Sequence, residues 1–137
     1  MPTLTEIHDE YDFLDADDRY RLLIDLGKTL PEMPAALKTD TTLVRGCSAS
    51  VWVYPTRTDG GTLNFLADSN AAITKGIIAL VLLTVQDQAP ADILSTDIAG
   101  ALAPFDLKNQ LSSNRTQGIP NMISLISLIR ETAGRYD

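Results

Sequence analysis

The sequence predicts an α+β domain in which a small antiparallel sheet, centred on one β-hairpin, packs against several helices. Apolar residues recur at helical spacing before and after the middle of the chain, and alternating residues flank the turn Thr58–Gly61. No repeat or low-complexity tract divides the sequence. With 137 residues and 45% hydrophobic composition, the chain is long enough for one cored domain, so we expect a single domain over 1–137.

Two helices are predicted before the hairpin. The first covers Thr5–Phe13, and the second follows Asp15, whose side chain suits an N-cap. Its apolar positions keep helical spacing up to Leu30, and Pro31 removes a backbone donor, so this helix should end near Leu30. A loop through Lys38–Thr42 should follow.

The hairpin is expected between residues 43 and 67. Leu43–Pro55 is rich in Val, Ser, Trp and Tyr and is predicted as the first strand. Thr58-Asp59-Gly60-Gly61 supplies the turn, and Thr62–Ala67 alternates as the second strand.

Helices should form most of the remaining chain. Asp68 and Ser69 are expected to cap a buried helix in which apolar residues recur from Ile73 to Thr84. An amphipathic helix at the C-terminal end carries Ile119, Met122, Ile123, Ile126 and Ile129. The predicted ranges are Ala91–Leu94 and Asp97–Ala101 for two short helices and Gln117–Thr132 for the last one.

Charge and hydropathy exclude several classes of protein. The formal charge is -7, and no clusters of Lys and Arg suit nucleic-acid phosphates. The N-terminus has no basic residues before an apolar run, so a signal peptide is not expected, and no apolar run reaches the roughly 20 residues of a membrane span. We expect a soluble cytoplasmic protein that binds neither nucleic acid nor membrane.

Cys47 is the only cysteine of the chain, so it has no partner for an internal disulfide. Any chemistry at this thiol must be completed by another molecule. Gly46 leaves the backbone beside the sulfur unhindered, Arg45 brings positive charge that favours a thiolate, and Ser48 offers a hydroxyl donor. The alternative is that Cys47 is a small buried apolar residue. No metal or cofactor is expected.

The only histidine, His8, lies in the first predicted helix. A Cys–His nucleophilic pair would require the fold to bring His8 to Cys47, and we instead expect His8 on a helix surface. Trp52 is a candidate for apolar cover over a sulfur intermediate, although a tryptophan is more often part of a core.

Three motifs together resemble the SufE family of sulfur-acceptor proteins. They are Gly46-Cys47 ahead of Val51-Trp52, Ala67-Asp68-Ser69 ahead of Lys75-Gly76, and Arg115-Thr116-Gln117-Gly118 ahead of Met122. The resemblance runs from Leu30-Pro31 nearly to the C-terminus. It implies a SufE/IscU-like fold and a covalent sulfur carrier, not an enzyme, that stimulates a SufS-like, pyridoxal-phosphate-dependent cysteine desulfurase and passes its sulfur to an iron-sulfur scaffold.

The same resemblance assigns roles to single residues. Cys47 matches the persulfide-accepting cysteine, and Arg115 and Gly118 match the arginine and glycine of the later motif. With Arg45, Gly46 and Ser48 they are candidates for partner binding or thiolate support. Three positions depart from the family pattern, namely Ala49, Asn70 and Asn114.

Two other functions remain open from the residues alone. A redox-sensing or peroxide-reactive protein also needs one activated cysteine, although it would have to obtain a resolving thiol from another molecule. A non-catalytic interaction domain would need no reactive thiol at all. Rapid oxidation without any response to a desulfurase favours the first, and retained function after Cys47→Ala favours the second.

Overall fold

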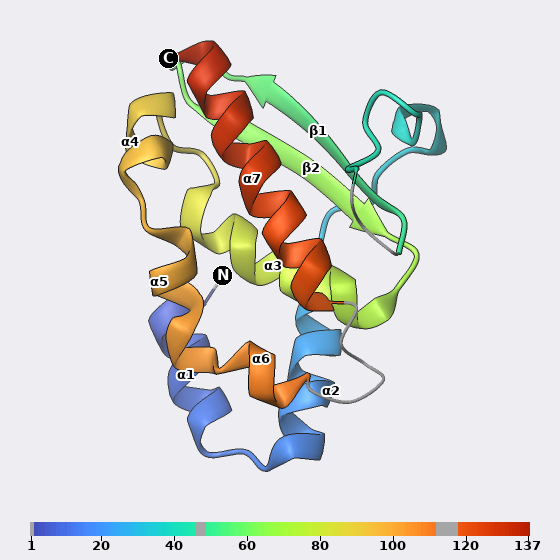
Figure 1. Ribbon diagram of the computed structural model, residues 1–137, viewed down its shortest axis with the longest axis vertical. Helices are drawn as coiled ribbons and strands as arrows, with labels where there is room; N and C mark the ends of the chain where they lie inside the picture. Colours follow the sequence, from blue (N-terminus) through green and yellow to red (C-terminus); the bar gives the residue numbers. More distant parts are fainter. Residues whose placement is uncertain (1, 46–48, 112–117) are drawn as a thin grey trace.

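A two-stranded antiparallel hairpin lies at one side of the fold against a buried central helix, and further helices pack around that helix (Figure 1). The computed structural model describes residues 2–45, 49–111 and 118–137. A mostly helical chain with one antiparallel hairpin confirms the predicted α+β class.

The hairpin consists of β1 (Val51–Arg57) and β2 (Leu63–Ser69), paired from Val51 opposite Ser69 to Arg57 opposite Leu63. Alternate residues face the core, since the side chains Val51, Val53, Leu63, Phe65 and Ala67 are buried. The turn is closed by the Thr58 N–H donating to the Thr62 carbonyl, with Gly61 at φ 82°. The predicted hairpin is confirmed. Its first strand, however, begins at Val51 and not at Leu43, which forms only an isolated bridge to Trp52.

The outer edge of β2 is covered by the chain that follows the central helix. The side-chain amide of Gln86 accepts from the Phe65 N–H at 2.7 Å and donates to the Phe65 carbonyl at 2.8 Å, so it pairs as a neighbouring strand would. Next to it, the Leu63 N–H donates to the Gln88 carbonyl. These bonds satisfy backbone groups that an open sheet edge would expose.

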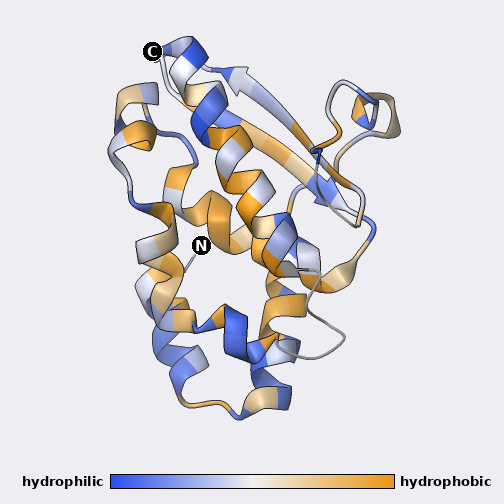
Figure 2. Cartoon of the chain, in the orientation of Figure 1, coloured by the Kyte–Doolittle hydropathy of each residue, from blue (hydrophilic) through white to orange (hydrophobic). Residues whose placement is uncertain are grey.

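The central helix, α3 (Ala72–Val85), is buried on nearly every side, as its continuous apolar sequence predicts. It contacts β2, α1, α2, α5 and α7. Figure 2 shows apolar colour along most of α3, whereas α7 alternates between apolar and polar residues. The predicted caps are wrong: Asp68 and Ser69 belong to β2, and the N-cap residue Ala71 makes no side-chain cap.

The amino-terminal helices are α1 (Leu4–Asp12) and α2 (Ala16–Gly27). Thr3 caps α1, and the predicted cap Asp15 accepts from the Asp18 N–H at 2.9 Å. The second helix ends at Gly27, before the predicted Leu30. There α2 crosses α3 closely, and a β-carbon at Gly27 would lie 2.7 Å from the Gly76 nitrogen. The residues after Gly27 form tighter turns with bonds between positions three apart. For example, the Thr29 N–H donates to the Leu26 carbonyl.

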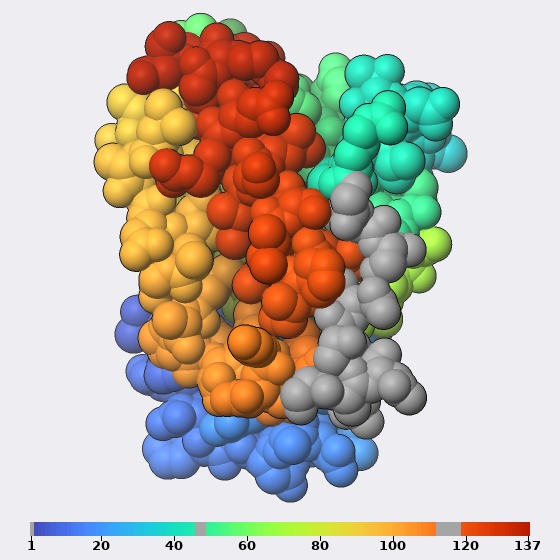
Figure 3. All heavy atoms as spheres, viewed as in Figure 1, coloured from blue at the N-terminus to red at the C-terminus, as the bar shows by residue number. Residues whose placement is uncertain are grey.

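Short helical segments connect these parts. The predicted short helices are confirmed as α4 (Pro90–Ser95) and α5 (Ile98–Leu102). The last helix, α7, is longer than predicted and covers Gly118–Tyr136. On the face drawn in Figure 3, α7 crosses the middle and α4 to α6 lie beside it. The segments that were not predicted are η1 (Ala35–Leu37), η2 (Ala103–Phe105) and α6 (Leu107–Gln110). Among the described residues, no helix is both long and apolar enough to cross a membrane.

Candidate functional site

The residues on either side of Cys47 are joined by an antiparallel bridge. The Val44 N–H donates to the Val51 carbonyl at 2.7 Å, and Leu43 pairs with Trp52 as an isolated bridge. Residues 45–50, here called the Cys47 segment, therefore connect two points that are fixed to each other. Of the predicted site residues, Gly46, Cys47, Ser48 and Arg115 lie outside the described part of the chain.

The end of β2 holds the outgoing side of the Cys47 segment. The Ser50 N–H donates to Asn70 Oδ1 at 3.2 Å, and the Asn70 N–H donates to the Ser50 carbonyl at 3.3 Å. The Ser69 hydroxyl donates to the same carbonyl at 2.7 Å. Asn70 thus supplies a neutral side-chain acceptor to the Ser50 N–H.

A charged cluster lies on the outward face of the hairpin, close to the ends of the Cys47 segment. Asp68, opposite Trp52 in the register, accepts from Lys38 Nζ at 2.8 Å and pairs with Lys75 Nζ at 3.5 Å. The Lys38 ammonium also lies 5.3 Å from the centre of the Trp52 ring, within range of a cation–π contact. Trp52 is half-buried, so it lies at the border of the core and not within it.

The Asp68 carboxyl remains ionised to lower pH than an ordinary aspartate. Burial would raise its pKa, but the hydrogen bonds from Lys38 and from the Ser69 N–H and the charge of Lys75 together lower the pKa below its usual value. The side chain is only 15% exposed, so water screens these contacts weakly.

Two further predicted residues fall within the described chain. Arg45 is exposed at the start of the Cys47 segment, and Gly118 is the first residue of α7. A groove of about 580 Å³ runs from Arg45 between residues 40–45 and α7. Ile123, which is 62% exposed, lies in this groove. Its other lining residues are Asp40, Thr41, Leu43, Val44, Ser124, Ser127, Leu128 and Glu131.

His8 is not a free surface residue. Its Nε2 lies 3.2 Å from the Pro104 carbonyl oxygen, and its ring meets the edge of Phe105 at 5.2 Å. Nearby, the buried Tyr11 hydroxyl donates to the Phe105 carbonyl at 2.7 Å. His8 therefore lies half-buried at the surface of α1, the helix on which it was expected, and also connects this helix to η2.

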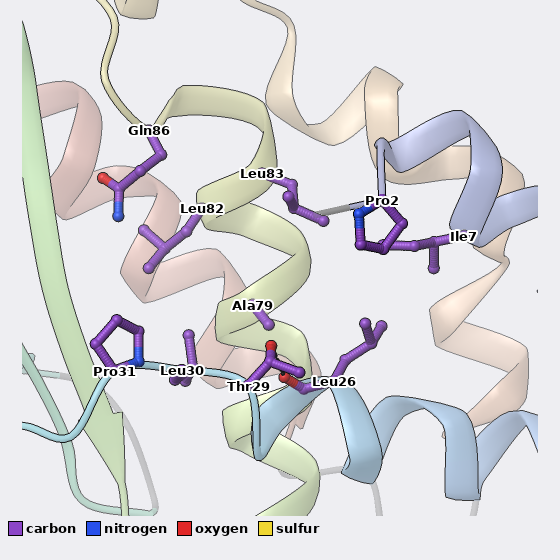
Figure 4. Close-up of a pocket in the computed structure, with 10 residues that line it drawn as sticks. All are labelled: Pro2, Ile7, Leu26, Thr29, Leu30, Pro31, Ala79, Leu82, Leu83 and Gln86. Carbon is purple, nitrogen blue, oxygen red and sulfur yellow. Dashed lines mark hydrogen bonds between the residues drawn. The ribbon is translucent and has the colours of Figure 1, made fainter.

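An apolar pocket of about 270 Å³ lies between the N-terminal residues, the end of α2 and α3 (Figure 4). Its two polar lining side chains already have partners: the Thr29 hydroxyl donates to the Leu26 carbonyl, and Gln86 binds Phe65. The pocket therefore offers shape but no group for catalysis. Within the three described ranges, no three His, Cys, Asp or Glu residues gather as a metal site.

Residues that hold the Cys47 segment were missed by sequence reasoning, although they lie in or beside a recognised motif. Ser69 and Asn70 follow Asp68 directly, yet their contacts with Ser50 join positions that are 19 and 20 residues apart. No local pattern reports such a pairing. The available signal was Asn70 itself, a short polar side chain that can accept a hydrogen bond, at one of the positions noted as departing from the family pattern.

Comparisons with known proteins agree on one family. Residues 5–129 match the model of the SufE Fe-S metabolism associated domain. An uncharacterized SufE-like protein of Rhizobium meliloti (strain 1021) is 36% identical over 139 residues, covering 98% of both chains. The sulfur acceptor protein CsdE of Escherichia coli (strain K12) is 34% identical over 103 residues, which cover 75% of this chain and 70% of that protein.

The fold is also similar to a solved structure. The solution structure of a hypothetical protein from Thermus thermophilus superposes with a TM-score of 0.70 and covers 97% of this chain and 94% of its own. At 15% sequence identity, this likeness establishes the shared fold alone.

Proposed function

The chain belongs to the SufE family, and we propose that it accepts a persulfide sulfur on Cys47 from a cysteine desulfurase and carries it to iron-sulfur cluster assembly. The name of the Escherichia coli relative supports sulfur acceptance, and the description of the family supports the destination. The partner is a pyridoxal-phosphate-dependent, SufS-like desulfurase, which the carrier also stimulates.

The observation that carries this proposal is the position of the only thiol in the chain. Cys47 belongs to a segment whose two ends are fixed by the bridge between Val44 and Val51 and by the contacts of Ser50 with Asn70. A nucleophile on a short connection whose two ends are joined by an antiparallel bridge at the start of β1 is suited to docking in a partner's active site.

The transfer is an exchange between sulfur atoms. The Cys47 thiolate attacks the outer sulfur of the desulfurase persulfide and forms a new S–S bond, while the S–S bond of the donor breaks and the donor cysteine leaves as a thiolate. One sulfur atom moves, and no external oxidant or reductant is consumed. The chain leaves the exchange as a Cys47 persulfide and can undergo the same reaction with the next acceptor.

The cellular setting follows from the chemistry. A thiol that must stay reduced between transfers fits a reducing compartment such as the cytoplasm. The excess of acidic residues, with a formal charge of -7, favours a partner that presents a basic docking surface.

The experiment treats the purified protein either with a cysteine desulfurase and cysteine or with dilute peroxide, and weighs the intact protein by mass spectrometry. Incubation with a cysteine desulfurase and cysteine should add whole sulfur atoms, and omission of the desulfurase should abolish the addition. A protein that gains oxygen from dilute peroxide, and no sulfur from the desulfurase, would instead be a redox sensor.

A further inference from the structure

We infer that Asp68 is a positioning residue for Cys47, because its carboxylate holds in place the part of the chain that leads into the Cys47 segment. The inference rests on the proposed function of Cys47. It concerns a contact between Asp68 and Lys38 that lies outside the Cys47 segment itself.

Residues 37–43, here called the entering unit, are tied together by hydrogen bonds. The Thr42 hydroxyl donates to the Leu37 carbonyl at 2.5 Å, and the Thr39 N–H donates to the Thr42 Oγ1 at 3.0 Å. The Leu43 N–H closes the unit on the Thr39 carbonyl at 3.0 Å. These bonds tie residues 37–43 into one compact turn, so an attachment at either end of the unit helps to hold the whole of it.

Two attachments join the entering unit to the hairpin. At its end, the Val53 N–H donates to the Thr42 carbonyl at 2.9 Å. At its start, Lys38 Nζ lies 2.8 Å from Asp68 Oδ2 and above the Trp52 ring. Lys38 is 31% exposed and Asp68 15% exposed, so this ion pair is much better shielded from water than a typical surface pair.

The outgoing side of the Cys47 segment is held from the same place. Ser69 and Asn70, the next two residues after Asp68, bind the backbone of Ser50. Three consecutive residues therefore fix both sides of the segment, with Asp68 acting on the entering side through Lys38. Anchoring the chain on both sides of a nucleophile lowers the entropy cost of presenting it to a donor, and this is the way in which we infer that Asp68 acts on sulfur acceptance.

Charge and anchoring can be separated by substitution. Two lysines, Lys38 and Lys75, share the single Asp68 carboxylate, so the cluster carries one excess positive charge. Asp68→Asn raises that excess, whereas Lys38→Met removes it. Both substitutions weaken the anchor, Asp68→Asn by removing the charge of the acceptor and Lys38→Met by removing the donor. Effects in the same direction therefore report anchoring, and effects in opposite directions report charge acting on the thiolate.

The test uses the full chain with Asp68→Asn, Lys38→Met and the control Asp25→Asn, which breaks the exposed Asp25–Lys28 pair on α2. Hydrogen exchange is measured over residues 39–45 and 49–53. Alkylation of Cys47 by iodoacetamide is followed against pH, and sulfur acceptance is followed against desulfurase concentration. Thermal unfolding first establishes that each variant is folded.

Both cluster variants should exchange these residues roughly five- to tenfold faster, the scale of one ordinary hydrogen bond, because the Lys38–Asp68 pair is partly exposed to water, while the control should not. The maximal rate of sulfur acceptance should fall in both by a similar factor. The inference is overturned if exchange is unchanged in both folded variants, if the maximal rate of sulfur acceptance is unchanged in both, or if the two shift the alkylation pH profile in opposite directions. If either variant fails to fold, exchange and the maximal rate of sulfur acceptance in the other decide.

Exchange and alkylation need no desulfurase. Faster exchange in both cluster variants, together with a wild-type protein that accepts no sulfur, would therefore overturn the function of Cys47 and with it the positioning role, while the anchor itself would stand as a structural feature.

Discussion

Ser50 and Asn70 hold each other through two reciprocal hydrogen bonds, one from the Ser50 N–H to Asn70 Oδ1 at 3.2 Å and one from the Asn70 N–H to the Ser50 carbonyl at 3.3 Å. This pair joins the outgoing side of the Cys47 segment to the junction between β2 and α3. The anchoring of the only thiol-bearing segment therefore depends on the side chain of a residue distant in sequence.

Asn70→Ala removes the side-chain oxygen that accepts from the Ser50 N–H, so this N–H loses that hydrogen bond. We expect the free energy of unfolding to fall by about 1 kcal/mol and hydrogen exchange at Ser50 to accelerate. Urea unfolding and exchange mass spectrometry measure the two effects. Asn70→Asp keeps an acceptor oxygen and should retain most of the protection. Equal exchange at Ser50 in the wild type and in Asn70→Ala would contradict this role.

Gly76→Ala should destabilise the protein because a β-carbon there would overlap the Leu23 carbonyl where α2 crosses α3. The free energy of unfolding should fall by about 1–3 kcal/mol, because the clash outweighs the gain in helix propensity from alanine. Gly134→Ala is the matched control on α7, since nothing lies within 4 Å of its β-carbon position. It should be neutral or stabilising by up to about 1 kcal/mol. Denaturant unfolding compares them, and equal stability of both variants would refute the close crossing.

The contribution of Asp68 to stability should depend on pH. The pKa of Asp68 is lower in the folded protein than in the unfolded chain. In an unfolded chain the pKa of an aspartate is about 3.9. The stabilisation from the ionised carboxylate is therefore fully present above the unfolded pKa and is lost as pH falls through the folded pKa.

Melting temperatures of the wild type and Asp68→Asn across this range measure the effect. The difference should be largest near neutral pH and should shrink below pH of about 4. A difference that stays constant from neutral to acidic pH would show that the charge of Asp68 contributes nothing, and that only its shape matters.

Arg115→Ala is predicted to weaken sulfur transfer from the desulfurase. If the guanidinium is buried in the complex, loss of its charge-assisted contact should cost about 1.5–3 kcal/mol in binding. Arg57→Ala, at the exposed end of β1, serves as a control for the lost charge. Titration of the desulfurase with each variant provides the measurement. Unchanged affinity and transfer rate for Arg115→Ala would leave it a surface residue without a role in docking.

Local signals predicted most of the helices and the hairpin. Asp15 caps α2 as expected, and the apolar spacing from Ile73 to Thr84 marks the buried α3. The family was also predicted correctly, because three spaced motifs are specific together. Predictions failed where side chains act over long range, since Asp68 binds Lys38 in place of capping α3.

Other features leave no periodic trace in the sequence. Gln86 completes the edge of β2 through its side-chain amide, and nothing in its neighbours distinguishes it from a surface glutamine. The strand predicted from Leu43 failed for a related reason. Leu43 and Val44 have strand-like composition, but they pair only briefly with the start of β1 before the Cys47 segment begins.

The most direct test of the central claim locates the transferred sulfur. The protein is incubated with a cysteine desulfurase and cysteine, blocked with iodoacetamide and digested with trypsin, which cleaves after Arg45 and Arg57. We predict an additional sulfur atom on the 46–57 peptide, which contains Cys47, and none in folded Cys47→Ser, because serine keeps the shape without a soft nucleophile. Sulfur loading of Cys47→Ser at the wild-type level, or its absence from the 46–57 peptide of the wild type, would contradict the proposed carrier function.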